Sequence, residues 1–243
     1  MSSQLPLFDS QDVTQSWTVR VSRKARRLSV RVFPGGRVEV VVPPGASATS
    51  VQRFVGMHRQ WIERRIEDLS SVAQPPADPR PAMISLPAIA RRYEVEYRHT
   101  PASARVLTDA AGTLLVRGAV QDERAVACAL RRWLVSLAEI EFSRALRTVA
   151  QQCGLPFQRV QIRRQRTRWG SCSATGTISL NVCLMFTTPA VLRYLFVHEL
   201  CHTRFMNHSR HFWALVASHE PAYEQLDREL SHAWKNVPSW MFT

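Results

Sequence analysis

The stretch that most constrains this chain is His198–His202, which reads HELCH and lies at the end of an apolar run. Two histidines four positions apart lie on one face of a helix of about 3.6 residues per turn, so their imidazoles can converge on one ion. Glu199 follows the first histidine and can reach a water bound to that ion. The pattern therefore predicts a helix that carries two ligands and the base of a catalytic zinc site.

The residues around this pattern favour a buried helix. Most positions between Val191 and Cys201 are apolar, as in a helix that packs in a core. A carboxylate flanked by two histidines would be costly to bury there without an ion, which favours a metal site over a solvated polar patch. Thr188 is placed to cap this helix, and Pro189 suits its first turn. Cys201 is expected to be a packed thiol rather than a ligand.

A third ligand is needed, because catalytic zinc usually has three protein ligands. His208 lies six residues after His202, an interval also found in metzincins, where a glycine between the ligands lets the chain turn. Here Phe205 occupies the glycine position, so we expect Asn207 to make the turn in a left-handed conformation. The other candidates for the third ligand stay open at this point: His211, His219, Glu220 and Glu224.

Several motifs resemble the YgjP-like metallopeptidase family, relatives of the SprT-like zinc proteases. They are Arg168–Cys172 (RWGSC), Gly176, Ile178, Asn181, the HELCH stretch, Asn207–Ser209, Phe212 and Trp213. In the N-terminal half, the matching segments are Arg26–Leu28, Val38–Pro43 and Phe54–Ile62. The resemblance implies an HExxH zinc metallopeptidase in which His198, His202 and His208 bind one Zn²⁺ per chain and Glu199 is the catalytic base.

The expected fold class is α+β, with a zincin-like catalytic domain, built around the HExxH active-site helix, preceded by a β-rich N-terminal accessory region. We place a flexible tail at 1–16 and the catalytic domain at 119–243. The region 17–118 between them is expected to contain strands, one long helix and a proline-rich linker at 70–82, where prolines cluster.

Hydrophobic periodicity supplies the elements of the N-terminal region. Alternating residues from Trp17 to Val42 predict strands with a turn at 34–36. Helical spacing follows from Ser47 or Thr49 to about Leu69. Short strands return between Met83 and Val116, with a hairpin turn at residues 111–112.

The C-terminal region begins with a long amphipathic helix from about Asp122 to Cys153, which Gly154 should end. Strands are expected at 160–162, 168–172 and 177–182. Ser209 should cap a helix over 210–218, and a last helix should run from Pro221 to about His232. The apolar tail after Pro238 is expected to fold back onto the body.

The hairpin of 168–172 and 177–182 precedes the metal-binding helix, where a β unit can offer its backbone to an extended peptide. By resemblance and geometry, we expect the substrate-binding residues to be Arg168, Trp169, Gly170, Ser171 and Cys172. A donor to the developing oxyanion is expected from Tyr223, Tyr194 or His211, among which the sequence does not choose.

The net charge of +13 and the isoelectric point near 10.8 imply attraction to polyanions, with DNA the first candidate and a basic surface that serves solubility the alternative. A cluster near the hairpin could hold such a partner beside the cleft: Arg163, Arg164, Arg166 and Arg168. By analogy with SprT-like enzymes, a peptidase activity stimulated by DNA would point to proteins associated with DNA as substrates. The positive charge also keeps two other functions open: a metal-dependent hydrolase of a nucleotide or phosphate ester, and a nucleic-acid-binding protein with a structural zinc site.

Five widely spaced cysteines, with no CxxC pair and no signal peptide, favour a reducing cytoplasm, and no apolar run is long enough to span a membrane. Near the N-terminus, the sequence QLPLF resembles the short peptide by which bacterial proteins bind the replicative sliding clamp. Its contact residues would be Gln4, Leu5, Leu7 and Phe8. The alternative is an arm that docks these apolar residues on its own fold.

Overall fold

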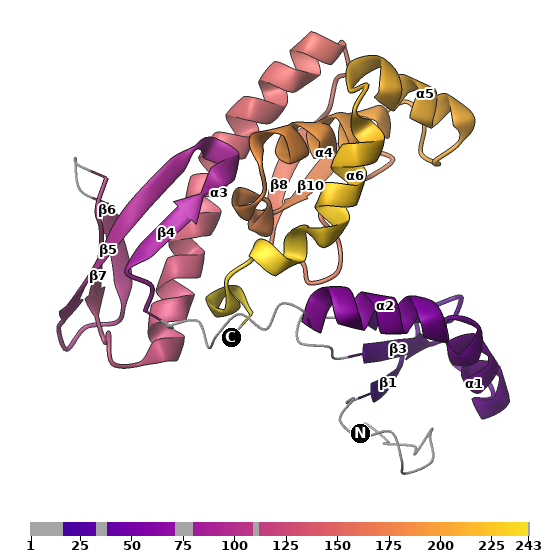
Figure 1. Ribbon diagram of the computed structural model, residues 1–243, viewed down its shortest axis with the longest axis horizontal. Helices are drawn as coiled ribbons and strands as arrows, with labels where there is room; N and C mark the ends of the chain where they lie inside the picture. The colour runs from indigo at the N-terminus through magenta and orange to yellow at the C-terminus, as the bar shows by residue number, and fades with distance from the viewer. Residues whose placement is uncertain (1–16, 33–37, 71–79, 109–111, 243) are drawn as a thin grey trace. The chain divides into compact units, whose positions relative to one another are not determined.

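The computed structural model describes residues 17–32, 38–70, 80–108 and 112–242 (Figure 1). The predicted clamp-binding residues 4, 5, 7 and 8 and the predicted turn at 34–36 lie outside them. The chain divides into two compact units, residues 1–74 and 75–243, and both contain helices and strands, so the fold is α+β. This division falls in the predicted proline-rich linker. The separate division into accessory and catalytic regions at residue 118 stays a prediction.

The first unit contains a three-stranded sheet in the order β1-β3-β2. β3 (Val38–Val42) pairs in parallel with β1 (Trp17–Val21) and antiparallel with β2 (Ser29–Val32). The predicted strands are therefore present. Val38 and Val40, two residues apart on the central strand, are both buried, as expected when one face of a pleated strand packs on a core.

The helix predicted from Ser47 or Thr49 to Leu69 is divided into two. Ser47 caps α1 (Ala48–Met57), and α2 (Arg59–Ser70) follows directly. The break is at His58, whose φ and ψ of −104° and 6° are not helical. Its ring nitrogen Nδ1 lies 2.8 Å from the carbonyl oxygen of Phe54, and this local bond satisfies the end of α1.

The second unit begins with a four-stranded sheet in the order β4-β5-β7-β6. The strands are β4 (Met83–Leu86), β5 (Arg91–His99), β6 (Arg105–Thr108) and β7 (Leu114–Gly118), with the short helix η1 (Pro87–Ile89) between the first two. β6 and β7 form the predicted antiparallel pair. Ile84, Leu86, Leu114 and Val116 are buried on the face that packs on the next helix.

That helix, α3 (Glu123–Cys153), agrees with the prediction. Asp122 accepts hydrogen bonds from the first turn, and Gly154 ends the helix at a φ of +63°, which glycine adopts without a steric penalty. Near the N-terminal end, Trp133 packs against Tyr93 of the sheet, whereas Phe142 farther along packs against the helix that carries the HELCH stretch. α3 thus joins the sheet to the rest of the second unit (Figure 1).

A second sheet, in the order β8-β10-β9, lies beside α3. β10 (Thr177–Asn181) pairs in parallel with β8 (Arg159–Arg163) and antiparallel with β9 (Gly170–Cys172). The predicted hairpin is therefore present, with β9 two residues shorter at its start than expected. The buried helix η2 (Val182–Phe186) then leads to α4.

The last three α-helices have the predicted order, and the two predicted caps are present. Thr188 caps α4 (Pro189–Cys201), and Ser209 caps α5 (Arg210–His219). α6 (Tyr223–His232) then packs against α4 (Figure 1).

The C-terminal segment forms η3 (Ala233–Asn236) and η4 (Ser239–Met241). Trp240 and Met241 are buried, and the side chain of Arg131 on α3 donates a hydrogen bond of 2.7 Å to the Trp240 carbonyl. The tail therefore folds back as predicted. All five cysteines are free thiols. None of the described helices combines the length and apolar character needed to cross a membrane.

Candidate metal centre

α4 places the HELCH stretch at the end of a helix that is buried on almost all sides. Tyr194, Phe196, Val197 and Leu200 are no more than 1% exposed, so apolar packing fixes the rotation of the helix. His198 and Glu199 lie in the last turn, and His202 is the residue that caps its C-terminus.

Three histidine side chains converge beyond this turn. One ring nitrogen from each of His198, His202 and His208 lies within 4.8 Å of the others. The Nε2 atoms of His198 and His208 are 3.2 Å apart. Two nitrogens on one tetrahedral zinc ion, each at about 2.0–2.1 Å, would be separated by about 3.3 Å. The three imidazoles therefore fit one zinc ion and could hold it.

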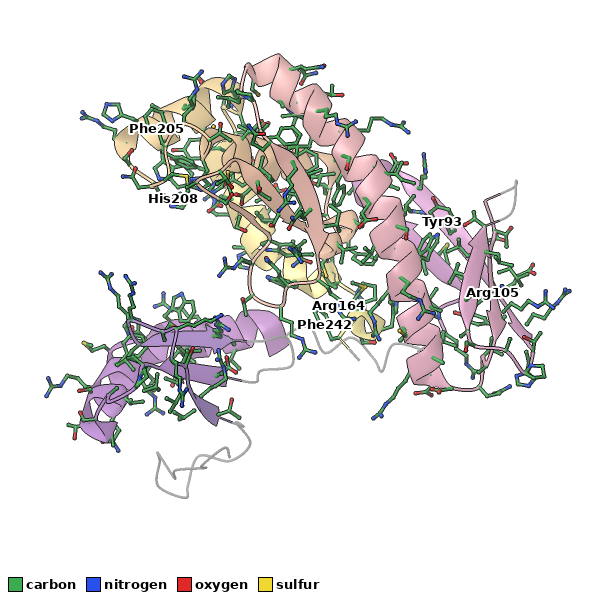
Figure 2. All side chains as sticks on the ribbon, turned by 180° about the vertical axis from the view of Figure 1, so that it is seen from behind. Tyr93, Arg105, Arg164, Phe205, His208 and Phe242 are labelled. Atoms are coloured by element: carbon green, nitrogen blue, oxygen red, sulfur yellow. The ribbon has the colours of Figure 1, made fainter. Side chains whose placement is uncertain are left out.

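The corner that brings His208 back is not made as predicted. Among the described residues other than glycine, only Ala90 has a positive φ, so the expectation of a left-handed Asn207 is wrong. The chain turns through backbone bonds from the N–H groups of residues 203, 204 and 205 to the last carbonyls of α4. His202 Nδ1 lies 3.0 Å from the Phe205 carbonyl, so the ring of one ligand also holds the corner. Figure 2 shows His208 and Phe205 at this end of the unit.

The bond to Phe205 also orients the His202 ring. A carbonyl oxygen can only accept, so His202 carries its proton on Nδ1 and leaves the Nε2 lone pair free for an ion. Aromatic side chains of α5 enclose the group. The Phe212 ring lies 5.0, 4.5 and 4.8 Å from the rings of His198, His202 and His208, and the Trp213 ring lies 5.7 and 5.6 Å from those of His198 and His208.

This environment favours neutral imidazoles. Burial, and then the neighbouring His202 and His208, lower the pKa of His198 to about 3. Burial likewise lowers the pKa of His202, partly offset by the bond to Phe205. Neutral imidazole is the form that binds a metal ion, so these two rings are ready to bind at neutral pH.

Glu199 is buried beside the histidines, with 4% of its surface exposed. Its Oε2 is buried and has no hydrogen-bond partner among the described residues. Burial raises the pKa of Glu199 to about 8, against an opposing effect of Arg168. A buried carboxyl group without a partner is costly unless it has a functional partner, and a pKa near neutrality suits a general base.

The predicted substrate-binding strand lies directly against this carboxyl group. A Cβ placed on Gly170 of β9 would overlap Glu199 Oε1 and lie 2.9 Å from its Cδ, so only glycine fits beside Glu199 in this arrangement. Asn181 holds the loop before the strand, because its Nδ2 donates bonds of 2.8 Å to the carbonyls of Gln165 and Arg168. Trp169, beside Gly170, stacks on Trp234 at 4.1 Å. Ser171 and Cys172 continue the strand at intermediate exposure.

The rival ligands lie elsewhere. His211 stacks on Phe205, Glu220 pairs with Arg193, and Glu224 accepts a bond from Tyr223. None of these three, nor His219, belongs to a metal-capable group among the described residues.

The three candidate donors to the oxyanion lie in different surroundings. Tyr194 is fully buried, and its hydroxyl donates to Asp227 at 2.7 Å. Tyr223 stacks on Trp213 at 5.3 Å. His211 is exposed in the first turn of α5. The donor to the oxyanion stays a prediction.

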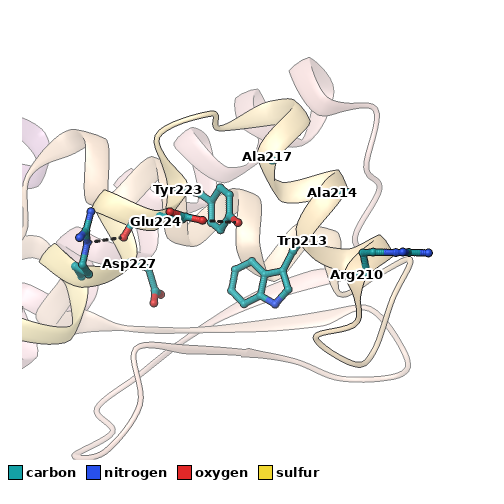
Figure 3. Close-up of a pocket in the computed structure, with 8 residues that line it drawn as sticks. Arg210, Trp213, Ala214, Ala217, Tyr223, Glu224 and Asp227 are labelled. Atoms are coloured by element: carbon teal, nitrogen blue, oxygen red, sulfur yellow. Dashed lines mark hydrogen bonds between the residues drawn. The ribbon is translucent and has the colours of Figure 1, made fainter.

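A pocket of about 720 Å³ lies between α5 and α6, and Trp213, whose ring also contacts His198 and His208, is one of its lining residues (Figure 3). Trp213 and Tyr223 supply aromatic surface, and Glu224 and Asp227 supply carboxylates. Asp227 could not be identified from the sequence, because it looks like any other charged residue on the polar face of an amphipathic helix. The close approach of Gly170 to Glu199 likewise follows from no local pattern.

The ligand geometry can be tested with metal alone. We expect the purified protein to bind one zinc ion per chain, and His208→Ala to lower zinc affinity more than about 100-fold, beyond the usual cost of removing a residue that only orients a ligand. His211→Ala is the matched control, because it removes a nearby exposed histidine that is outside the group, and it should bind zinc like the parent. Competition with a chromogenic chelator gives both affinities. Equal reductions in the two variants would exclude His208 as a specific ligand.

Comparison with known proteins agrees with the motifs. Residues 26–233 match the family model described as YgjP-like, metallopeptidase domain. No curated protein and no solved structure matches the chain. The family match covers far more than half of the chain and includes the three histidines and Glu199. It identifies a metallopeptidase, a hydrolase of peptide bonds that depends on a metal ion, typically zinc. The chain therefore belongs to the YgjP-like metallopeptidase family.

Proposed function

We propose that this metallopeptidase is of the HExxH type, with a zincin-like catalytic domain in which His198, His202 and His208 hold one zinc ion and Glu199 is the general base. The observation that carries the proposal is the buried Glu199 carboxyl group, without a partner for Oε2 among the described residues, next to three imidazoles that fit one ion. A bound ion would supply Lewis acidity that polarises the substrate carbonyl and makes a water acidic near neutral pH.

The residues of the chain would perform the proton transfers. Glu199 takes a proton from the attacking water. The same carboxyl group then gives the proton to the leaving amine. The absence of a side chain at Gly170 leaves room for the carboxyl group in this position, and the aromatic rings of Phe212 and Trp213 lie against the histidines.

We propose that the backbone of β9 aligns a peptide. The bonds from Asn181 N–H to the Trp169 carbonyl and from Ser173 N–H to the Thr177 carbonyl face β10. Because backbone groups alternate in direction along a strand, those of Gly170 and Cys172 face the other way, toward the outer edge of an edge strand. An extended substrate could add to this edge beside Glu199, which supports the role proposed for residues 168–172.

Two other functions fit less well. Sites that hydrolyse phosphate esters usually use carboxylate-rich or two-metal arrangements, whereas the ligand group here is three histidines. A structural zinc site usually has four protein ligands, and three ligands beside a buried carboxyl group leave a position for water.

We also propose that the basic surface near β9 binds a polyanion such as DNA, so that proteins associated with DNA become substrates. Between Glu141 and Glu199 the sequence contains no Asp or Glu. Its arginines are Arg144, Arg147, Arg159, Arg163, Arg164, Arg166, Arg168 and Arg193. Those of the loop before β9 are exposed, and Arg168 is close enough to act on the charge of Glu199. A phosphate backbone bound there would therefore lie near the catalytic groups.

Glu199→Gln tests the general base. The zinc-loaded variant should retain its metal and lose about 10²–10⁴-fold in kcat on an unfolded protein substrate, because proton transfer by a side chain contributes about that much. Glu139→Gln is the control, since Glu139 is an exposed carboxylate on α3. Full activity of Glu199→Gln would remove the residue from its proposed role.

Gly170→Ala tests the contact that places the base. The added methyl group must displace Glu199, so kcat should fall at least about tenfold while zinc content is unchanged. Gly56→Ala is the control, because a Cβ there meets nothing within 4 Å and alanine is favoured inside a helix. Comparable kcat values for parent and Gly170→Ala would show that the strand does not constrain Glu199.

Charge removal tests the polyanion surface. The triple alanine variant of Arg163, Arg164 and Arg166 should bind a DNA duplex more weakly, and the slope of log Kd against log salt should fall by about 0.9 for each phosphate that the variant no longer neutralises. The control removes equal charge from Arg92, Arg98 and Arg117, which are exposed on the β4–β7 sheet. Fluorescence anisotropy gives both quantities, and an equal effect of the two triple variants would indicate only a general charge effect.

A further inference from the structure

A chain of two polar contacts runs from one metal-site histidine to the surface of the second unit. Tyr194 Oη lies 3.4 Å from His198 Nδ1, one helical turn along α4. The same hydroxyl donates a hydrogen bond of 2.7 Å to Asp227 Oδ1 on α6. Tyr194 is fully buried, whereas Asp227 is exposed and lines the pocket between α5 and α6 (Figure 3).

The direction of these contacts follows from which atoms carry protons. A phenol has one proton, and Tyr194 gives it to Asp227, because a carboxylate oxygen only accepts. The Tyr194 oxygen then presents only lone pairs to His198. The ring nitrogen facing it must therefore be the one that carries hydrogen, which leaves the lone pair on Nε2. That Nε2 is the atom 3.2 Å from His208 Nε2.

We infer that Asp227 is a positioning residue that acts through Tyr194 to hold His198 in the tautomer with Nδ1–H, so that Nε2 is free to bind the metal ion. The inference rests on the metal-binding part of the proposed function. His202 is held in the same tautomer by a backbone carbonyl, whereas the group that faces Nδ1 of His198, one turn inside α4, is the Tyr194 hydroxyl. That hydroxyl is oriented by a side chain from α6, that of Asp227.

Loss of Asp227 would reverse the direction of the hydrogen bond between Tyr194 and His198. The buried Tyr194 hydroxyl would have no carboxylate to accept its proton and would donate to His198 Nδ1, because an unpaired buried hydroxyl is costly. The hydrogen of His198 would then move to Nε2, where it competes with the metal ion. The removal of a residue that touches no ligand is therefore expected to weaken metal binding.

The test compares Asp227→Ala with Glu224→Ala. Both variants remove an exposed carboxylate from the same helix and the same pocket, but Glu224 contacts Tyr223 and not Tyr194. We expect Asp227→Ala to lower zinc affinity about 10–100-fold, as for other residues that orient ligating histidines, and Glu224→Ala to leave it unchanged. Tyr194→Phe should weaken zinc binding to a similar extent. The double variant should bind zinc little more weakly than either single variant, because both substitutions interrupt the same chain of contacts from Asp227 through Tyr194 to His198.

A second measurement uses the metal-free protein and reports on the tautomer directly. Long-range ¹H–¹⁵N spectra of the histidine rings should show His198 protonated on Nδ1 in the parent and in Glu224→Ala, and on Nε2 in Asp227→Ala. This readout requires neither metal nor activity, so it tests the relay even if the proposed peptidase chemistry fails. An unchanged tautomer in Asp227→Ala, or an equal fall in zinc affinity in the two alanine variants, would overturn the inference.

Discussion

The candidate site depends on the burial of one apolar helix. α4 is enclosed by α3, α5, α6, η1 and β9, and its residues from Tyr194 to Cys201 are almost wholly withdrawn from water apart from His198. Burial of each large side chain there, such as Phe196 against Phe142, contributes about 1.5–3 kcal/mol. That packing fixes the helix rotation, and the rotation fixes where His198 and Glu199 point. His198 and Glu199, whose polar groups are costly to bury, are held there by the surrounding apolar contacts.

The polar groups are then oriented by neighbours of three different kinds. A backbone carbonyl, that of Phe205, holds the His202 ring. A side-chain hydroxyl, that of Tyr194, faces His198. Glycine at residue 170 leaves room for the Glu199 carboxyl group, whose Oε2 has no partner among the described residues. In the proposed mechanism, the first two neighbours hold rings in defined tautomers, whereas the third leaves the Glu199 base free to react. This difference fits the proposed roles, because metal ligands need fixed lone pairs and a base needs an available one.

Much of the fold could be predicted because local signals agreed with the tertiary structure. The caps at Thr188 and Ser209 and the glycine at residue 154 mark helix ends in the sequence, and all three do so in the structure. Predictions failed where a local preference was overridden. A periodic helix is interrupted at His58, whose ring lies 2.8 Å from the Phe54 carbonyl. Asn207 stays out of the left-handed region because backbone bonds to the end of α4 already turn the chain.

The sequence by itself determined the family and the local order of the candidate groups: the motifs identify the family, and the HELCH spacing places two histidines and a carboxylate at one helix end. Spacing could not choose the third histidine from its rivals, because the path of the chain between residues 202 and 208 depends on hydrogen bonds that no periodicity encodes. Only the tertiary structure brought His208 to the other rings, placed β9 against Glu199 and connected Asp227 to His198 through Tyr194. Those contacts join segments far apart in the chain, and they exist only once the core of the second unit has formed.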